Sequence, residues 1–368
     1  MKIKWCILLL SICLLPVKWG RASEAKTVYF RSDASAEPFP VTVILPTDYN
    51  AQRSTAYPLL VTTAGDSRFE VLKAQVHWLS HVSFGPMPKV VILRLPNFDN
   101  ASADKKQSEI SATTFHQQVL PFVRQSFNIA PFTLLEGFST RANLALDMLS
   151  QFPQAYQASI ISSPALELES AKWNNRLLAE LKQQQTHKLY IAYGSFNGQR
   201  AEFDSLFNGL TAQPNKVLSD LEAENYISTP LIHFETSVRQ LFLPLSVQNF
   251  ELYSAQGVQG ILAYHQSLQA EFGYVISANV NLEGLANYYL ENDSVEKGLA
   301  VFQYIIESAP DEQLYSVRYG QALLRVGRFE KAQQVLENAM VQAKKAQDDE
   351  AINYIQHLLQ QASQHGRG

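Results

Sequence analysis

The sequence predicts an α/β protein with a mostly parallel sheet, followed by a small all-α helical-repeat domain. Between residues 27 and 152, short runs rich in β-forming residues alternate with longer amphipathic runs, as in a sheet flanked by helices. Several of the short runs are apolar throughout, which is expected of strands covered on both faces. From about Asn279 onwards the strand signals vanish and helical periodicity takes over.

Length and composition agree with two folded units. The 368 residues are enough for one α/β domain of about 250 residues and a smaller helical one. A hydrophobic content of 46% with 17% charged residues predicts a sizeable core. We therefore expect a leader over residues 1–22, an α/β domain over 23–275 and a helical domain over 276–365.

The first residues have the pattern of a secretory leader. Lys2 and Lys4 precede an apolar run over 5–17, and a small-x-small pattern then ends at Ala22. We predict a Sec-type signal peptide and a periplasmic or secreted protein. The alternative, an uncleaved membrane anchor, needs a longer apolar segment of about 20 residues.

Cleavage after Ala22 would change both the cysteine content and the charge. Cys6 and Cys13 both lie in the leader, so the mature chain would hold no disulfide and no thiolate. The leader carries four basic and no acidic residues, so the net charge would move from −4 to −8. This acidic balance argues against nucleic acid and against anionic membrane surfaces as partners.

The strands and helices can be placed coarsely. The expected strands are residues 41–45, 58–62, 90–93, 132–135, 159–162 and 188–193. The expected helices between them are residues 69–80, 114–126 and 142–152.

The C-terminal part resembles a tetratricopeptide repeat when Pro310 is aligned with the closing proline of one unit. The packing positions are then Leu285, Ala286, Tyr289, Gly298, Phe302 and Ile305, followed about 34 residues on by Tyr319, Gly320, Leu323, Ala332, Leu336 and Ala339. A last helix over 348–362 would cap the stack. The alternative is an ordinary pair of helical hairpins.

A serine occupies the turn between the expected strand 132–135 and the expected helix 142–152. The segment Gly137-Phe138-Ser139-Thr140-Arg141 matches a nucleophile elbow, Gly-x-Ser-x-Gly, except that Arg141 replaces the last small residue. In such an elbow the serine oxygen stands exposed beside backbone N–H groups that can hold an oxyanion. Alternatively, Ser139 caps the following helix.

Several segments, in order, resemble the putative-esterase family of α/β-hydrolases, which includes enterochelin esterase-like and S-formylglutathione hydrolase-like proteins. They are residues 57–61, 94–99, 118–123, 137–141, 152–156 and 162–165. The resemblance covers about residues 27–270, and some members of the family also end in tetratricopeptide-like helices. It implies the α/β-hydrolase fold.

The resemblance also implies carboxylic ester hydrolysis by a serine, a histidine and an acid. Ser139 matches the nucleophile. Asn197 stands at the acid position. Glu235 stands at the histidine position, two residues before Ser237-Val238, which matches the pair that opens a helix in the family. His233, two residues upstream of Glu235, is the candidate base if the loop is offset.

Backbone groups could form the oxyanion hole even where side chains are replaced. The donors would be the N–H of Thr140 and that of Gly65 or Asp66. Arg141 either holds an anionic group of a ligand or fills space at the elbow.

Two functions stay open from the sequence. The first is an exported esterase acting on a small-molecule ester through Ser139. The second is a pseudo-esterase that binds a ligand in its pocket or a protein partner through its helical repeats. We expect no cofactor and no metal, because no metal-binding spacing, phosphate-binding loop or dinucleotide motif is present.

Overall fold

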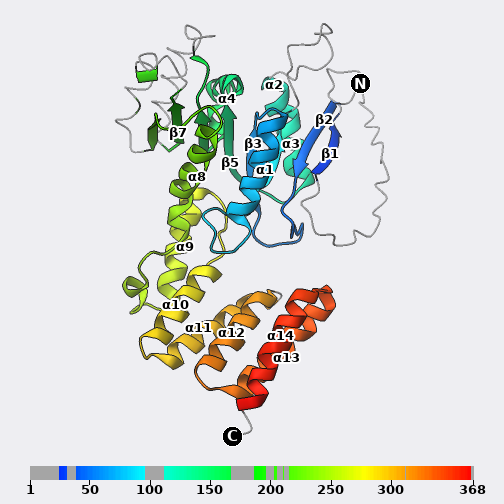
Figure 1. Ribbon diagram of the computed structural model, residues 1–368, viewed down its shortest axis with the longest axis vertical. Helices are drawn as coiled ribbons and strands as arrows, with labels where there is room; N and C mark the ends of the chain where they lie inside the picture. Colours follow the sequence, from blue (N-terminus) through cyan, green and yellow to red (C-terminus); the bar gives the residue numbers. More distant parts are fainter. Residues whose placement is uncertain are drawn as a thin grey trace, which may run out of the picture.

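The structure is a computed structural model that describes residues 25–30, 39–95, 112–166, 186–195, 203–204, 210, 215–310 and 312–365. The predicted signal peptide and Asn197 lie outside the described residues. An α/β unit and a helical unit follow one another along the chain (Figure 1).

The α/β unit is built on an eight-stranded sheet with the order β1-β2-β4-β3-β5-β6-β7-β8. The strands are β1 (Ala25–Phe30), β2 (Phe39–Ile44), β3 (Tyr57–Thr62), β4 (Val91–Arg94), β5 (Ile129–Phe138), β6 (Ala158–Ser162), β7 (Lys188–Gly194) and β8 (Lys216–Leu221). Strand β2 is antiparallel to both β1 and β4, and the other pairs are parallel. All six expected strands are present, whereas β1 and β8 were not predicted.

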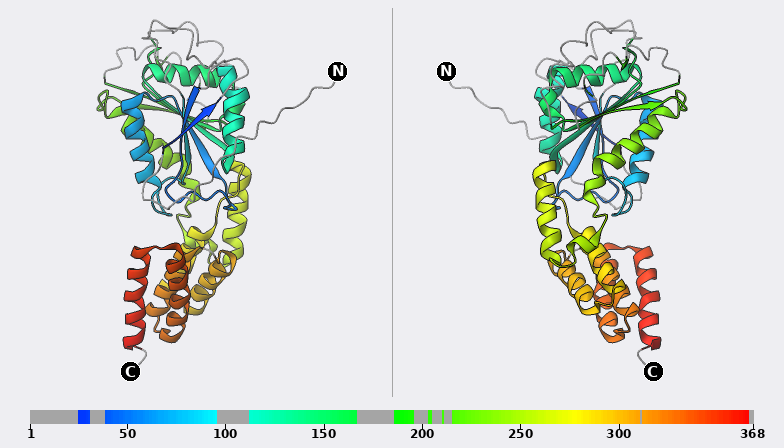
Figure 2. Two further views of the ribbon diagram at one scale, coloured as in Figure 1. Left: turned by 90° about the vertical axis from the view of Figure 1, so that its right-hand side faces the viewer. Right: turned by 90° about the vertical axis from the view of Figure 1, so that its left-hand side faces the viewer.

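Helices cover both faces of the sheet, as the all-apolar strands predict (Figure 2). On one face lie α3 (Leu120–Ser126) and α4 (Thr140–Gln151), which share a core cluster with Leu59, Val61 and Leu135. On the other face lie α1 (Asp66–Ser80), α8 (Thr229–Phe242) and α9 (Val258–Phe272), which share a second cluster with Leu60 and Leu134. The short α2 (Ala112–Thr114) and a π-helical turn over Phe115–Val119 lead into α3.

The helical unit contains α10 (Asn279–Glu291), α11 (Val295–Ser308), α12 (Gln313–Arg325), α13 (Phe329–Ala346) and α14 (Asp349–His365). The apolar residues expected at packing positions are buried, and Gly298 and Gly320 lie where an added Cβ would collide with a facing leucine. Gly327, after α12, has a φ of +74°. The helices and their buried faces therefore agree with the prediction.

The arrangement leaves the serine elbow, which we define as residues 137–141, clear of the helical unit. Helix α4 starts at the elbow and lies at the end of the sheet away from α10–α14 (Figures 1 and 2). Helix α9 connects the two units. Within the described ranges, no helix combines the length and apolar character needed to cross a membrane.

Candidate ligand site at the serine elbow

Ser139 has the backbone conformation of a strained turn. Its φ is +57° and its ψ is −133°, a region that costs a non-glycine residue about 1–3 kcal/mol. The residue is half-buried at the start of α4, yet its side chain forms no capping hydrogen bond. An ordinary N-cap has an unstrained backbone and uses its hydroxyl to accept a hydrogen bond from the first turn of the helix. The geometry is therefore that of a nucleophile elbow.

The first small residue of the elbow is required by packing. A Cβ added to Gly137 would lie 2.8 Å from the Cβ of Ala145 and 2.9 Å from the Cα of Ala142. The last position tolerates Arg141, whose side chain is half-buried and whose carbonyl oxygen accepts a hydrogen bond from Thr63 Oγ1 (2.8 Å). The replacement of glycine by Arg141 has thus not destroyed the turn.

The expected oxyanion donors lie at two helix N-termini held side by side. Thr140 is the first residue of α4, and Gly65 is the N-cap of α1. Thr63 joins the two, because its N–H donates to Glu136 O (3.1 Å) and its hydroxyl to Arg141 O. We call residues 63–66 the Gly65 turn. Amides in the first turn of a helix lack partners within that helix, so both termini can receive an anion.

The other residues predicted near the base position do not meet Ser139. Helix α8 begins at Thr229, so the expectation that a helix opens at Ser237-Val238 is wrong, because that pair lies in the middle of α8. Glu235 is on the surface of α8 and pairs with Arg239 (2.8 Å). Asp66, the alternative oxyanion donor to Gly65, is the first residue of α1. Its side chain is largely exposed and pairs with Arg94.

His233 is fully buried in α8. Its Nδ1 is 2.8 Å from Ser162 Oγ, and its Nε2 is buried without a partner among the described residues. Burial, and after it the charge of Arg68, lowers the pKa of His233 to about 3. The structure therefore places this imidazole behind the elbow, against β6, and does not bring it to Ser139.

Tyr226 lies beside the elbow, in the segment that precedes α8. It lies in residues 222–228, which we call the Tyr226 loop and which lead from β8 into α8. Its ring packs on Phe138, the neighbour of Ser139, with 4.8 Å between ring centroids. Tyr226 also stands two residues before Ser228-Thr229, the pair that opens α8. Pro230 beside that pair is a helix-start signal that could have identified this position from the sequence.

No histidine of the chain is bonded to Ser139 in the described part of the structure. All eight histidine positions lie within the described ranges. His116 bonds to Tyr156 Oη, His187 to Tyr156 O and His265 to Asn281. His77 and His81 belong to α1 and its end, and His357 and His365 belong to α14. Among the described side chains, no imidazole, the usual base of a serine hydrolase, is thus hydrogen-bonded to Ser139.

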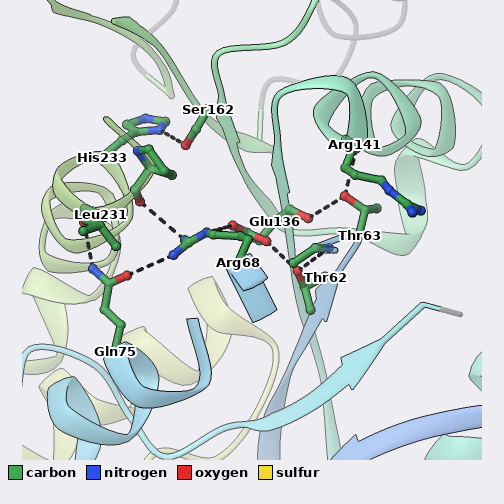
Figure 3. Close-up of polar contacts among 11 residues, drawn as sticks. Thr62, Thr63, Arg68, Gln75, Glu136, Arg141, Ser162, Leu231 and His233 are labelled. Atoms are coloured by element: carbon green, nitrogen blue, oxygen red, sulfur yellow. Dashed lines mark hydrogen bonds and ion pairs between the residues drawn. The ribbon is translucent and has the colours of Figure 1, made fainter. Parts of the chain in front are cut away.

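Beneath the elbow lies a buried ion pair that the sequence did not predict. Glu136, 1% exposed, accepts hydrogen bonds from Thr62 Oγ1 (2.5 Å) and from Arg68 Nη2 (3.0 Å) (Figure 3). Arg68 also donates to Pro230 O (3.4 Å) in the first turn of α8. The pair lies between Thr62 and Thr63 on one side and the Ser162–His233 contact on the other.

A match to a family model shows which protein family the chain belongs to. The model described as "Putative esterase" matches residues 32–222, more than half of the sequence. The chain belongs to this esterase family. Its sheet is the one that the resemblance implied.

Solved structures show the same fold. An IroE-like serine hydrolase from Shewanella oneidensis is 17% identical with a TM-score of 0.60, over 77% of this chain and 99% of that one. An uncharacterised protein from Capnocytophaga ochracea is 12% identical with a TM-score of 0.56, over 91% of this chain and 100% of that one. The chain has no match among curated proteins. At these identities the structures show the esterase fold alone.

The described residues contain no group of three or more histidine, cysteine, aspartate or glutamate side chains placed to hold a metal ion. Among the described residues, the elbow presents the Ser139 hydroxyl and the backbone amides of two helix N-termini, and the Tyr226 ring packs beside it on Phe138.

Proposed function

We propose that this esterase-family protein binds a small-molecule ester or a related ligand at Ser139 without efficient hydrolysis. The observation that carries the proposal is Tyr226, whose ring packs on Phe138 and which precedes the opening pair of α8 by two residues, as the family histidine is expected to do. A phenol does not accept a proton at neutral pH as an imidazole does. Ser139 then has no base among the described residues to activate it.

The preserved parts of the elbow support ligand binding. The strain at Ser139 and the paired N-termini of α1 and α4 favour a carbonyl or another electron-rich group beside the hydroxyl. The same two features are what an active esterase would need. An esterase with slow turnover is therefore the second candidate function.

Two finer points are part of the proposal. We infer export of the mature chain from the leader pattern of residues 1–22. We also infer that α10–α14 form tetratricopeptide-like pairs that bind a protein partner, because their packing positions follow the expected repeat spacing. Neither point bears on the chemistry at Ser139.

The test of the proposed function is to restore the missing groups. A Tyr226→His variant combined with Asn197→Asp supplies a base at the Tyr226 loop and an acid at the family's acid position. We expect labelling of Ser139 by a fluorophosphonate to accelerate by at least about 10²-fold, the usual contribution of general base catalysis. Tyr226→His alone should gain less, because an imidazole without its carboxylate is poorly oriented.

Glu235→His is the matched control, since it adds an imidazole on the surface of α8, the helix that follows the Tyr226 loop. It should leave the labelling rate at the native level. Equal gains in both variants, or no gain in the double variant, would contradict the assignment of Tyr226 to the base position.

A further inference from the structure

The ion pair beneath the elbow is linked, through neighbouring residues, to all three segments that form the proposed site. Glu136 lies in β5, three residues before Ser139, and its side chain is almost completely buried. Arg68 lies in the first turn of α1, three residues after Gly65, with a side chain only 9% exposed. Neither residue is part of the elbow, and no contact between either of them and Ser139 is seen in the described residues.

The Glu136 carboxylate holds the Gly65 turn through a threonine. Thr62 donates its hydroxyl proton to Glu136 Oε2 (2.5 Å), and Thr62 Oγ1 in turn accepts the N–H of Ala64 (3.0 Å). The amide next to Gly65 is thus fixed by a chain of two hydrogen bonds that ends on Glu136. Such hydrogen-bonded chains fix the orientation of backbone N–H donors, and an oxyanion site requires donors with a fixed orientation.

Arg68 extends the same pair to α8. Its Nε and Nη2 both donate to Glu136 Oε1 (3.2 and 3.0 Å), and Nη2 also reaches Pro230 O (3.4 Å). Gln75 reinforces this contact by donating to Leu231 O (2.7 Å). The Tyr226 loop is tied to that first turn of α8, because Asn225 O accepts the N–H of Thr229 (3.0 Å).

A second route joins α8 to the elbow from the opposite side. His233 bonds to the hydroxyl of Ser162, and the carbonyl oxygen of Ser162 accepts the N–H of Ser139 (3.0 Å). The backbone of Ser139 is therefore connected to α8 through β6, and Figure 3 shows the His233–Ser162 contact on the opposite side of the ion pair from Thr62.

We propose that Glu136 and Arg68 are positioning residues that fix the serine elbow, the Gly65 turn and the Tyr226 loop relative to one another. A charged pair in this core is not needed for stability as such, since apolar residues of similar volume often replace a buried pair without loss. Its hydrogen bonds instead give the three segments one defined arrangement. The inference rests on the proposed function only in taking Ser139 as the centre of the site.

The test is hydrogen exchange, measured peptide by peptide, in the full chain with Arg68→Met and Glu136→Leu combined. We expect exchange at residues 63–67, 137–141 and 224–229 to accelerate by about tenfold while the rest of the sheet stays near native. Arg318→Met with Glu283→Leu is the control, because it removes a partly buried pair (3.5 Å) in the helical unit. That control should leave the three segments unchanged.

Thr62→Val separates the two arms of the network and preserves the size of the side chain. It removes only the link from Glu136 to Ala64, so exchange should accelerate at 63–67 and stay native at 224–229. Unchanged exchange at all three segments in the folded double variant, or equal acceleration over the whole sheet, would overturn the proposal. If the double variant does not fold, Thr62→Val alone decides, and native exchange at 63–67 then overturns it. Exchange needs neither ligand nor turnover, so this result is independent of the labelling of Ser139.

Discussion

At the scale of single residues, the environment of each histidine decides what it does. His233 and His187 are fully buried, with 0% and 2% exposure, and each has one ring nitrogen without a partner among the described residues. Burial lowers the pKa of His233 to about 3 and that of His187 to about 4. It also lowers the pKa of His116 and His265. His233 and His187 are therefore neutral parts of the core at neutral pH.

The buried histidines predict an acid-sensitive fold. In the unfolded chain His233 has its ordinary pKa near 6.5, so between about pH 6.5 and pH 3 the unfolded state binds more protons. The free energy of unfolding then falls as the pH falls, by about 2 kcal/mol at pH 5 for His233. Urea unfolding at pH 5 and pH 8 measures this difference.

His233→Gln removes that titrating group, so the difference between pH 5 and pH 8 should shrink by about 1–2 kcal/mol whatever the absolute stability. His77→Gln, at an exposed position of α1, controls for the loss of an imidazole. An undiminished difference in His233→Gln would contradict the burial of this ring in solution.

At the scale of elements, the elbow could be predicted because its signals are local. An apolar run, two small or polar residues and a helical pattern follow one another within 20 or so residues. The same holds for strands β2 to β7. The ion pair was missed because Glu136 and Arg68 are 68 positions apart in the sequence. The residues next to Glu136 in the sequence do not indicate which cation will pair with a carboxylate in a central strand.

Helix α8 was misplaced although its signals are present. Ser228-Thr229-Pro230 starts the helix, and Phe234, Val238, Leu241 and Phe242 form its buried face at helical spacing. The family pattern, matched at Ser237-Val238, places the start of this helix about two turns too late. That match points to Glu235 and His233 as site residues and does not point to Tyr226.

Gly137→Ala tests the packing of the elbow. The added methyl group collides with Ala142 and Ala145 of α4, so we expect a loss of about 1–3 kcal/mol in the free energy of unfolding. Gly65→Ala is the matched control, because no atom lies within 4 Å of a Cβ at Gly65, whose φ is −67°. Denaturant unfolding of both variants measures the difference. Equal stabilities would show that α4 does not pack on β5 as described.

At the scale of the whole molecule, the α/β unit and the helical unit share one connecting helix. Helix α9 contributes Leu268 and Phe272 to the core under the sheet and Ile261 to the core of the helical unit. The Capnocytophaga ochracea structure covers 91% of the chain, whereas residues 1–275 make up only about three quarters of it. That likeness therefore includes part of the helical unit. The domain boundary near residue 275 stays a prediction.

Asn281 is the polar centre of this junction. Its side chain accepts from Val247 N (3.0 Å), donates to Leu245 O (2.9 Å) and contacts His265 Nε2 (2.8 Å). Asn281→Ala leaves those buried groups unpaired, so we expect a loss of about 1–3 kcal/mol in urea unfolding. Asn287→Ala, in the same helix and without a side-chain hydrogen bond among the described residues, is the control. An equal loss in both variants would contradict the role of Asn281.

The central claim is that Ser139 sits in an intact elbow without a base to activate it. Labelling of the native protein by a fluorophosphonate, followed by intact mass, tests this most directly, with Ser139→Ala as the reference. We predict no more labelling of the native protein than of Ser139→Ala, over times in which an active serine hydrolase is fully modified. Stoichiometric labelling that disappears in Ser139→Ala would contradict the claim and make the protein an esterase with a base other than Tyr226.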